Sequence, residues 1–196
     1  KDNFELLKTE LSEIEKLYAI NRKKFEELKS ITPNERVDDE NEALYYQIRN
    51  MFNDLTEKKY SEALLYFFIN KTAYSGMIRY NSKGEFNVPY GRYANLNTSL
   101  VTKAHNNLLS KTEIYNLDYS EIFRMADKDD FMFLDPPYDC VFSDYGNVEH
   151  KDGFNERNHI ELANQYKQLK CKALMVIGRT PLTEKLYGEM IVDEYG

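Results

Sequence analysis

The chain has 196 residues, of which 42% are apolar and 30% are charged, and its formal net charge at pH 7 is -7. These values are ordinary for a soluble globular protein with one substantial core and room for a smaller lobe. No apolar run reaches the roughly eighteen residues that cross a membrane, and no signal peptide is recognisable. The sequence therefore favours a cytoplasmic protein over an exported or membrane-spanning one.

The cysteines and histidines form no metal-binding pattern. Cys140 and Cys171 are the only cysteines, and they are most simply reduced thiols. His105, His150 and His159 are scattered without the spacing of metal ligands, so they are expected on the surface or on helices. The sequence predicts no metal site.

Charge is distributed unevenly along the chain. Residues 71–111 contain six basic residues and one acidic residue, a net charge of +5, whereas residues 1–70 and 112–196 carry net charges of -4 and -8. A basic segment between two acidic ones is expected where one lobe meets phosphate. A charged run alone is more often just a solvated surface.

Three helices are predicted in the first seventy residues. Apolar residues at steps of three and four from Phe4 predict an amphipathic helix to about Leu28, with Leu7, Leu11, Ile14 and Leu17 in its apolar pattern. A second helix is predicted with a buried face formed by Leu44, Tyr45, Ile48 and Phe52. The third, over residues 61–71, is rich in Leu and Phe and is expected in the core.

The pattern changes over residues 74–93, which contain three glycines, several aromatic residues and basic residues but no sustained helical period. Glycine permits tight turns, arginine can read guanine or grip phosphate, and aromatic rings can stack on bases. On composition alone, a decorated loop or hairpin without such a role is equally consistent with this stretch.

Two further elements are predicted before residue 120. Residues 97–110 predict a helix with Leu100, Ala104, Asn107 and Leu108 on one face, and residues 113–117 predict a strand. Asp118 follows that strand and is a good N-cap for a helix over residues 119–126.

Residues 131–138 read Phe-Met-Phe-Leu-Asp-Pro-Pro-Tyr. The apolar run predicts a strand buried on both faces, and pairing must end at Asp135 because proline cannot donate to a sheet ladder. The Asp135 carboxylate, the Pro136 carbonyl and the Tyr138 ring are then presented beyond the carboxyl end of a strand, where open α/β sheets bind ligands. The alternative is an ordinary turn, since Asp and Pro favour turns.

The remaining residues predict alternating helix and strand. Residues 141–155 are expected to form a flap, residues 156–169 a helix, residues 173–177 a strand and residues 181–187 the start of a helix. Strands that alternate with helices predict an α/β protein with a right-handed parallel arrangement.

Asp135-Pro136-Pro137-Tyr138 resembles the motif of DNA methyltransferases that modify an exocyclic amino nitrogen, and in particular the adenine-N6 enzymes. The resemblance implies that Asp135 and the Pro136 carbonyl accept the N–H groups of adenine N6, so that its lone pair points at a methyl group. It also implies that Tyr138 stacks on the extruded base, and that S-adenosylmethionine is the methyl donor.

The segment after residue 73 extends this resemblance. Arg79-Tyr80-Asn81, Gly84 to Pro89 and Gly91-Arg92-Tyr93 are similar to the target-recognition segment of Dam-type adenine methyltransferases, which act on GATC or related sites. The resemblance implies that Arg79 reads the first guanine. Ser75 and Met77 stand where the best-known members carry Asn and Leu. The resemblance implies these duplex-contacting residues: Tyr74, Ser75, Met77, Arg79, Asn81, Lys83, Pro89, Arg92 and Tyr93.

For the methyl donor, the resemblance implies contacts from Asp135, Asp118 and Tyr119. The Phe-x-Gly-x-Gly loop that binds the donor in Dam-like enzymes does not occur in this sequence, and Gly178-Arg179-Thr180 replaces the Ser-Asn pair common after the corresponding strand. We therefore expect these residues to be part of a longer protein, cut at both ends. No role is assigned to Gly178-Arg179-Thr180.

The resemblance implies a Rossmann-like S-adenosylmethionine-dependent methyltransferase sheet with an inserted, mainly helical DNA-recognition lobe. Residues 1–111 would form that lobe, with residues 74–95 as the DNA-contact segment, and residues 112–196 would form part of the catalytic domain. The expected partners are double-stranded DNA and S-adenosylmethionine, together with a restriction endonuclease related only through a shared site. The protein is expected near the nucleoid of a bacterium or phage-infected cell.

Three interpretations remain open. The chain is expected to belong to a site-specific adenine-N6 DNA methyltransferase. The first alternative is a DNA-binding remnant that lacks a complete donor site. The second alternative is a cytosine-N4 enzyme, which Asp135 disfavours because Ser is more usual at the first motif position there.

Overall fold

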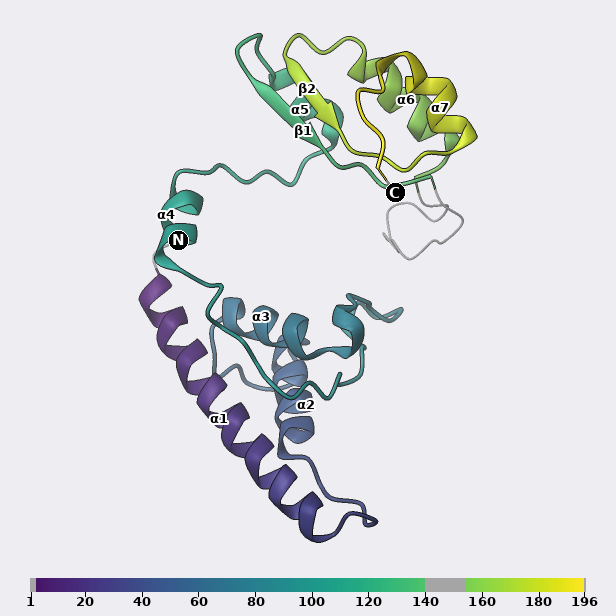
Figure 1. The fold of residues 1–196 in the computed structure, drawn as a ribbon. Coiled ribbons are helices and arrows are strands. Elements are labelled where there is room, and N and C mark those ends of the chain that lie inside the picture. The colour runs from purple at the N-terminus through teal and green to yellow at the C-terminus, as the bar shows by residue number, and fades with distance from the viewer. Residues whose placement is uncertain (1–2, 140–153, 196) are drawn as a thin grey trace. The chain divides into compact units, whose positions relative to one another are not determined.

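The computed structural model describes residues 3–139 and 154–195. The chain divides into two compact units, residues 1–113 and 114–196 (Figure 1). In the first unit, helices α1 (Phe4–Ile31), α2 (Glu40–Phe52) and α3 (Glu62–Thr72) pack against one another. Asp39 caps α2 by accepting from a backbone N–H of its first turn, and Ser61 caps α3 in the same way. All three helices were predicted, and the ends of α1 and α3 lie within a few residues of the predicted ones.

The core of the first unit is one cluster of buried side chains from α1, α2, α3 and the segment that follows them. The predicted buried face of α2 is confirmed at Leu44, Tyr45 and Ile48. On α1, Tyr18 is buried whereas Leu17 is 38% exposed. The buried face of α1 is therefore rotated slightly from the one that the apolar pattern predicted, and it includes Tyr18, whose hydroxyl lies in the core.

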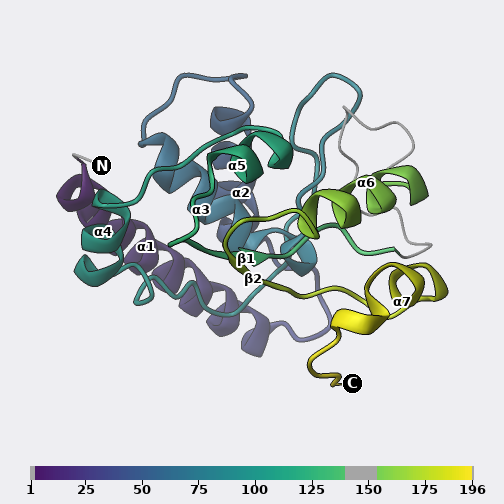
Figure 2. The same ribbon diagram turned by 90° about the horizontal axis from the view of Figure 1, so that it is seen from above.

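The predicted helix over residues 97–110 is correct only in its second half, α4 (Lys103–Ser110). Before it, the Asn97 side chain accepts from the Ser99 backbone N–H (2.9 Å), and Thr98 donates to Glu15 on α1. Such side-chain bonds compete with helix formation. In addition, α4 has no buried residue, and it lies beside the N-terminal end of α1 (Figure 1, Figure 2).

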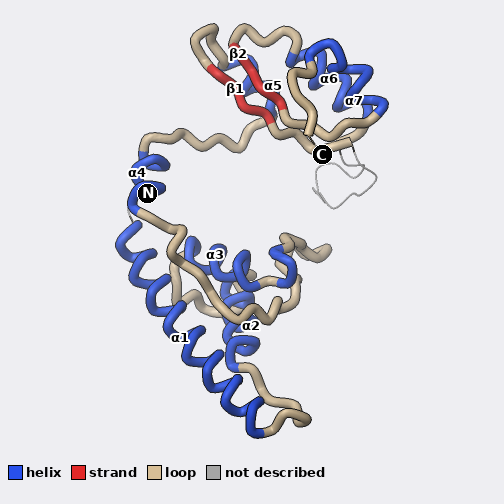
Figure 3. The backbone as a smooth tube through the Cα atoms, in the orientation of Figure 1, coloured by secondary structure: helices blue, strands red, loops and turns tan. Residues whose placement is uncertain are grey.

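The second unit contains α5 (Tyr119–Met125), β1 (Phe131–Leu134), α6 (Glu156–Tyr166), β2 (Lys172–Met175) and α7 (Pro181–Tyr187). The two strands are parallel, with Phe131 opposite Lys172 and Leu134 opposite Met175. They form a small sheet, coloured red in Figure 3. The parallel pairing confirms the α/β prediction, since parallel neighbours need a crossover connection, here one that contains α6.

Two predictions about the sheet are wrong. Phe131 and Phe133 on β1 are 64% and 63% exposed, so this strand is not buried on both faces in the described structure. Residues 113–117 are irregular, and Ile114 is 77% exposed. Apolar alternation favours a strand, but a ladder also needs a neighbouring strand, and β1 pairs only with β2 among the described residues.

Short 3₁₀ turns occupy Tyr74–Gly76 and Gly188–Met190. Most of the predicted flap, Val141 to Asn155, lies outside the described residues, as do Cys140 and His150. In the parts of the chain that the structure describes, no helix combines the length and the apolar content needed to cross a membrane.

Candidate functional site

The segment after α3 is held by side chains of α2 and of its C-cap, Asn53. Asn53 donates to the Phe86 carbonyl (2.9 Å) and accepts from the Phe86 N–H (2.8 Å), so one side chain satisfies both backbone groups of that residue. Tyr45 and Arg49 both donate to the Val88 carbonyl, at 2.8 and 3.2 Å. Phe86 and Val88 are themselves buried, so α2 fixes the path of this segment.

Two antiparallel bridges, Ala73 with Tyr90 and Tyr80 with Phe86, fold the segment back on itself. At its tip the Asn81 side-chain oxygen accepts from the Lys83 and Glu85 backbone N–H groups. Gly84 has φ +78°, which favours glycine at this turn. The segment is therefore a hairpin-like loop, which agrees with the absence of a sustained helical period in its sequence.

Tyr18 of α1 forms hydrogen bonds with the C-terminal end of this loop. Its single hydroxyl proton goes to the Tyr93 carbonyl (2.6 Å), so Tyr90 is the donor in the 2.6 Å contact between Tyr18 and Tyr90. Burial, together with this donated bond, raises the pKa of Tyr90 far above its ordinary value. Both hydroxyls therefore remain neutral at physiological pH.

Gly91 is the residue at which the loop approaches α3 most tightly. Its N–H donates to the Thr72 carbonyl at 2.8 Å. A Cβ at this position would lie 2.5 Å from the Tyr93 ring, 2.9 Å from the Ala73 carbonyl oxygen and 3.0 Å from that of Thr72. Backbone atoms cannot give way as a flexible side chain does, so only glycine fits here.

The residues predicted to contact DNA come together on this loop, and most are exposed. Arg79 donates through Nε to the Asn87 side chain (2.9 Å), which orients the guanidinium without burying it. Arg92 has φ +56° and lies 3.4 Å from Glu42 of α2. Asn81 and Glu85 also hydrogen-bond through their side chains. The other exposed residues of the predicted set are Tyr74, Ser75, Met77, Lys83, Pro89 and Tyr93.

Asp135-Pro136-Pro137-Tyr138 follows the last residue of β1, as predicted. The ladder continues for one bond beyond the strands, from the Val176 N–H to the Leu134 carbonyl (3.0 Å), and ends there. Asp135 is exposed, and Tyr138 borders a pocket of about 760 Å³. The pocket is also lined by residues 173–179 and 190–195, and by Tyr166 and Tyr187. Burial raises the pKa of Tyr187 to about 12, so its hydroxyl is neutral.

Asp118 and Tyr119 lie at the start of α5, in the same unit as Asp135. The Asp118 carboxylate accepts from the Ser120 N–H (2.9 Å), which confirms its prediction as an N-cap. The Tyr119 ring packs edge-on against Phe123, with ring centroids 5.4 Å apart. Burial, reinforced by the Glu161 carboxylate, raises the pKa of Tyr119.

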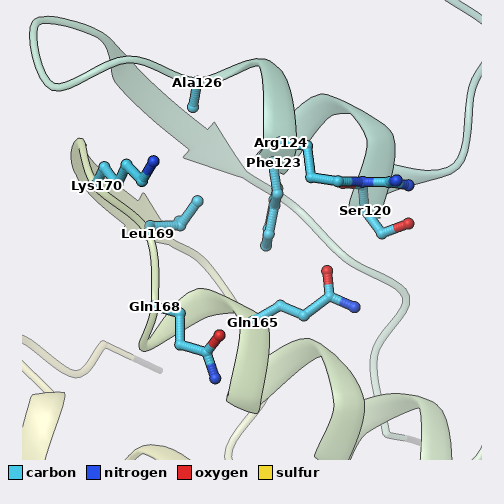
Figure 4. A pocket seen from close by; sticks show the side chains of 8 residues that line it. All are labelled: Ser120, Phe123, Arg124, Ala126, Gln165, Gln168, Leu169 and Lys170. Carbon is cyan, nitrogen blue, oxygen red and sulfur yellow. The ribbon is translucent and has the colours of Figure 1, made fainter.

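A second pocket lies between α5 and the end of α6 (Figure 4). Phe123 points into it, facing Gln165 and Leu169, and Lys170 lies on the segment just before β2. Arg124 forms an ion pair with Glu121. None of the predicted site residues lines this pocket.

Sequence reasoning missed the hydrogen bonds that α2 and its C-cap make to α1 and to the loop. Asn41, Tyr45 and Arg49 recur every four residues on α2, and its C-cap, Asn53, continues this spacing. Each donates to a backbone carbonyl, and Asn41 reaches that of Tyr18 (2.9 Å). Polar side chains at this spacing beside the apolar face of a helix were the signal in the sequence that could have predicted these bonds. Among the described residues, no group of three or more His, Cys, Asp or Glu could hold a metal ion.

Comparison with known proteins bears on both units. The Type II methyltransferase M.CviBI of Paramecium bursaria Chlorella virus NC1A is 38% identical over 156 residues, which cover 79% of this chain and 57% of that protein. The Retron Ec67 DNA adenine methylase of Escherichia coli is 34% identical over 153 residues, covering 74% of this chain and 52% of that protein. The chain thus spans about half the length of these relatives.

A shorter match is the DNA adenine methylase of Salmonella typhi, which is 36% identical over 102 residues, covering 48% of this chain and 34% of that protein. The family model described as D12 class N6 adenine-specific DNA methyltransferase matches residues 10–194. Since this match covers nearly the whole chain, the chain belongs to the D12 class of N6 adenine-specific DNA methyltransferases.

Proposed function

We propose that this chain carries the DNA-recognition and methyl-transfer residues of a site-specific DNA methyltransferase that acts on adenine N6. The observation that carries the proposal is Asp135-Pro136-Pro137-Tyr138 directly after a parallel strand, in a member of this family. Its site would be GATC or a closely related duplex sequence, with the target base extruded. The fold would be a Rossmann-like sheet, with residues 1–111 as a helical recognition lobe and residues 112–196 as part of the catalytic domain.

The proposed chemistry depends on acceptors at the end of β1. Adenine N6 is a poor nucleophile because its lone pair is delocalised into the ring. Acceptance of its two N–H groups by Asp135 and the Pro136 carbonyl would draw the nitrogen toward tetrahedral geometry and stabilise the positive charge that develops on it. Stacking on Tyr138, worth about 1–3 kcal/mol, would offset much of the cost of extruding the base.

The proposed donor is S-adenosylmethionine, which supplies an electrophilic methyl group when bound. Asp118 and Tyr119 fit its adenosine part, because they combine an exposed carboxylate with a half-buried neutral ring at one helix start. Asp135 would contact the donor from the end of β1. These three residues are our proposed donor contacts.

Exposed side chains on a rigid loop support the proposal of duplex binding. The nine predicted contact residues lie on residues 74–93, within the segment of net charge +5. Arg79 would read a guanine, Tyr74 would wedge beside the target step, and Lys83 and Arg92 would meet phosphate. Met77, Pro89 and Tyr93 would contact the inner bases, together with Ser75 and Asn81.

The biological setting follows from the proposed activity. Some relatives are named Type II methyltransferases and others DNA adenine methylases, so the site would be one that a restriction endonuclease shares or one used for housekeeping. Methylation of DNA would place the protein in the cytoplasm with the nucleoid.

The deciding experiment substitutes Asp135→Ala and measures methyl transfer and duplex binding separately. We expect transfer to be abolished and binding to survive, because Asp135 lies outside the recognition loop. Asp129→Ala, which removes an exposed carboxylate just before β1, is the control and should remain active. Transfer that persists without Asp135 would contradict the proposal. Binding with no transfer by the unsubstituted protein would instead favour a non-catalytic DNA-binding role, and transfer to cytosine rather than to adenine would indicate a cytosine-N4 enzyme.

A further inference from the structure

The segment from Asp135 to Asp139 is attached at both ends to one connection, the residues between β2 and α7. At its start, the Leu134 carbonyl accepts from the Val176 N–H (3.0 Å). At its end, the Asp139 carboxylate accepts from the Thr180 hydroxyl (2.7 Å) in a partly buried contact. The four motif residues therefore form a short arch between two fixed points.

The second attachment point is itself rigid. Thr180 is the N-cap of α7, and its hydroxyl oxygen accepts from the Thr183 N–H (3.2 Å). Thr183 is 3% exposed, and its hydroxyl donates to the Gly178 carbonyl (2.8 Å) while accepting from the Thr180 N–H (2.8 Å). These bonds leave the Thr180 hydroxyl proton directed at Asp139.

The arch is also stiff along its length. Pro136 and Pro137 each have φ fixed by the ring, so few backbone angles remain to vary between the two attachments. Gly178, in the same connection, faces the Tyr138 ring, since a Cβ there would be 3.8 Å from ring atom Cδ2. The connection therefore lies beside Tyr138 and hydrogen-bonds Asp139 through Thr180.

We infer that Asp139 and Thr180 are positioning residues for methyl transfer, which fix Asp135 and Tyr138 relative to the sheet. This inference rests on the proposed function. It gives a role to Gly178-Arg179-Thr180, which departs from the pattern of related enzymes. Neither Asp139 nor Thr180 needs to touch the base, because each acts through the backbone of the arch.

The expected effect is on the rate of transfer. Displacement of a reacting group by about 1 Å can lower a rate roughly a hundredfold. Loss of the Asp139–Thr180 bond frees one end of the arch while the Leu134 attachment remains, so we expect Asp139→Ala to lower the single-turnover rate roughly tenfold to a hundredfold. Affinity for the duplex should not change, since the predicted recognition residues lie on the loop after α3.

The test compares a matched pair at each residue in the full chain. Asp139→Asn keeps an oxygen that accepts from Thr180 and should restore most of the rate, whereas Asp139→Ala should not. Thr180→Ser keeps the hydroxyl and should be nearly unaffected, whereas Thr180→Val should be slow. Because Thr180→Val also removes the cap of α7, the Asp139 pair decides the question. Asp129→Ala serves as the control for loss of a carboxylate.

The outcomes separate this inference from the proposed function. An unsubstituted protein that binds DNA but transfers no methyl group would contradict the proposed function and, with it, the inference. With the unsubstituted protein active, a wild-type rate for Asp139→Ala would overturn the positioning role alone. Equal slowing by Asp139→Asn and Asp139→Ala would also overturn it, because the hydrogen bond would not be the cause. A slow alanine variant with unchanged duplex affinity and rescue by asparagine supports it.

Discussion

His159 illustrates how much a single residue depends on its surroundings. Its side chain is fully buried on α6, and neither ring nitrogen has a hydrogen-bond partner among the described residues. The ring packs edge-on against Phe154 at 4.7 Å. Burial lowers the pKa of His159, and the Asp139 carboxylate opposes this only in part. The ring is therefore held as a neutral core residue.

The first residue-scale prediction concerns pH. Since the folded pKa of His159 lies below the ordinary value of 6.5, the unfolded chain binds a proton that the folded chain does not, and stability falls as pH drops below about 6.5. His159→Leu removes this contribution and an unsatisfied buried group. We expect the variant to lose less stability between pH 7 and 5 than the unsubstituted protein, as measured by urea unfolding. An equal loss of stability in the two proteins between pH 7 and 5 would contradict this prediction.

The second residue-scale prediction concerns Arg79. Its guanidinium is exposed and oriented by Asn87, which suits a bidentate guanine contact. Arg79→Ala should reduce discrimination at one guanine by about 1–3 kcal/mol, measured by binding to duplexes substituted at each position. Lys83→Ala is the comparison, and it should weaken binding to all duplexes alike and lower the salt dependence. An unchanged base preference in Arg79→Ala would remove its proposed role.

At the scale of elements, α2 is more than a packing helix. Its buried face joins the core, and side chains spaced by four residues, from Asn41 to the C-cap Asn53, donate to carbonyls of α1 and of the loop after α3. The loop also has two bridges, a 3₁₀ turn and side-chain hydrogen bonds of its own. Contacts with α2, α1 and α3 therefore act together with these internal bonds to set its conformation.

The element-scale prediction follows from the Asn53 side chain. Asn53→Ala leaves the N–H and the carbonyl of the buried Phe86 without their partner, which should cost about 1–3 kcal/mol of unfolding free energy. Urea unfolding measures this cost, and duplex discrimination should fall with it as the loop loosens. Gln47→Ala, an exposed change on α2, should stay within about 0.5 kcal/mol. Equal effects of the two changes would mean that α2 does not hold the loop.

At the scale of the molecule, the two units differ in how they are stabilised. The large apolar cluster lies entirely within residues 1–113, and the basic segment lies there too. The second unit has a two-stranded sheet with exposed phenylalanines on β1. The first unit therefore holds both the core and the proposed duplex-binding surface.

The prediction at this scale is that residues 1–113 alone unfold cooperatively and bind duplex DNA. The core cluster needs no residue beyond Val101, which packs against it. Binding should weaken steeply as salt is raised, since it would depend on phosphate contacts. Calorimetric unfolding and a salt titration of fluorescence anisotropy check the two parts. A broad, non-cooperative transition would show instead that the first unit requires the second.

The sequence by itself determined the features that depend on local patterns. Helices α1, α2, α3 and α7 follow from apolar spacing and capping residues, and Asp135-Pro136-Pro137-Tyr138 ends a strand because proline cannot extend a ladder. The family was also readable, because both of its motifs are contiguous in the chain. These signals need no knowledge of distant contacts.

Only the tertiary structure decided features that depend on partners far away in the chain. Thr98 donates to Glu15 of α1, which helps to keep residues 97–102 irregular, and residues 113–117 form no strand because no neighbour supplies a ladder among the described residues. The hydrogen bond from Asn53 to the Phe86 carbonyl and the one from Thr180 to Asp139 each join residues dozens of positions apart. Local propensity carries no information about such pairs, since the fold alone brings them within hydrogen-bonding distance.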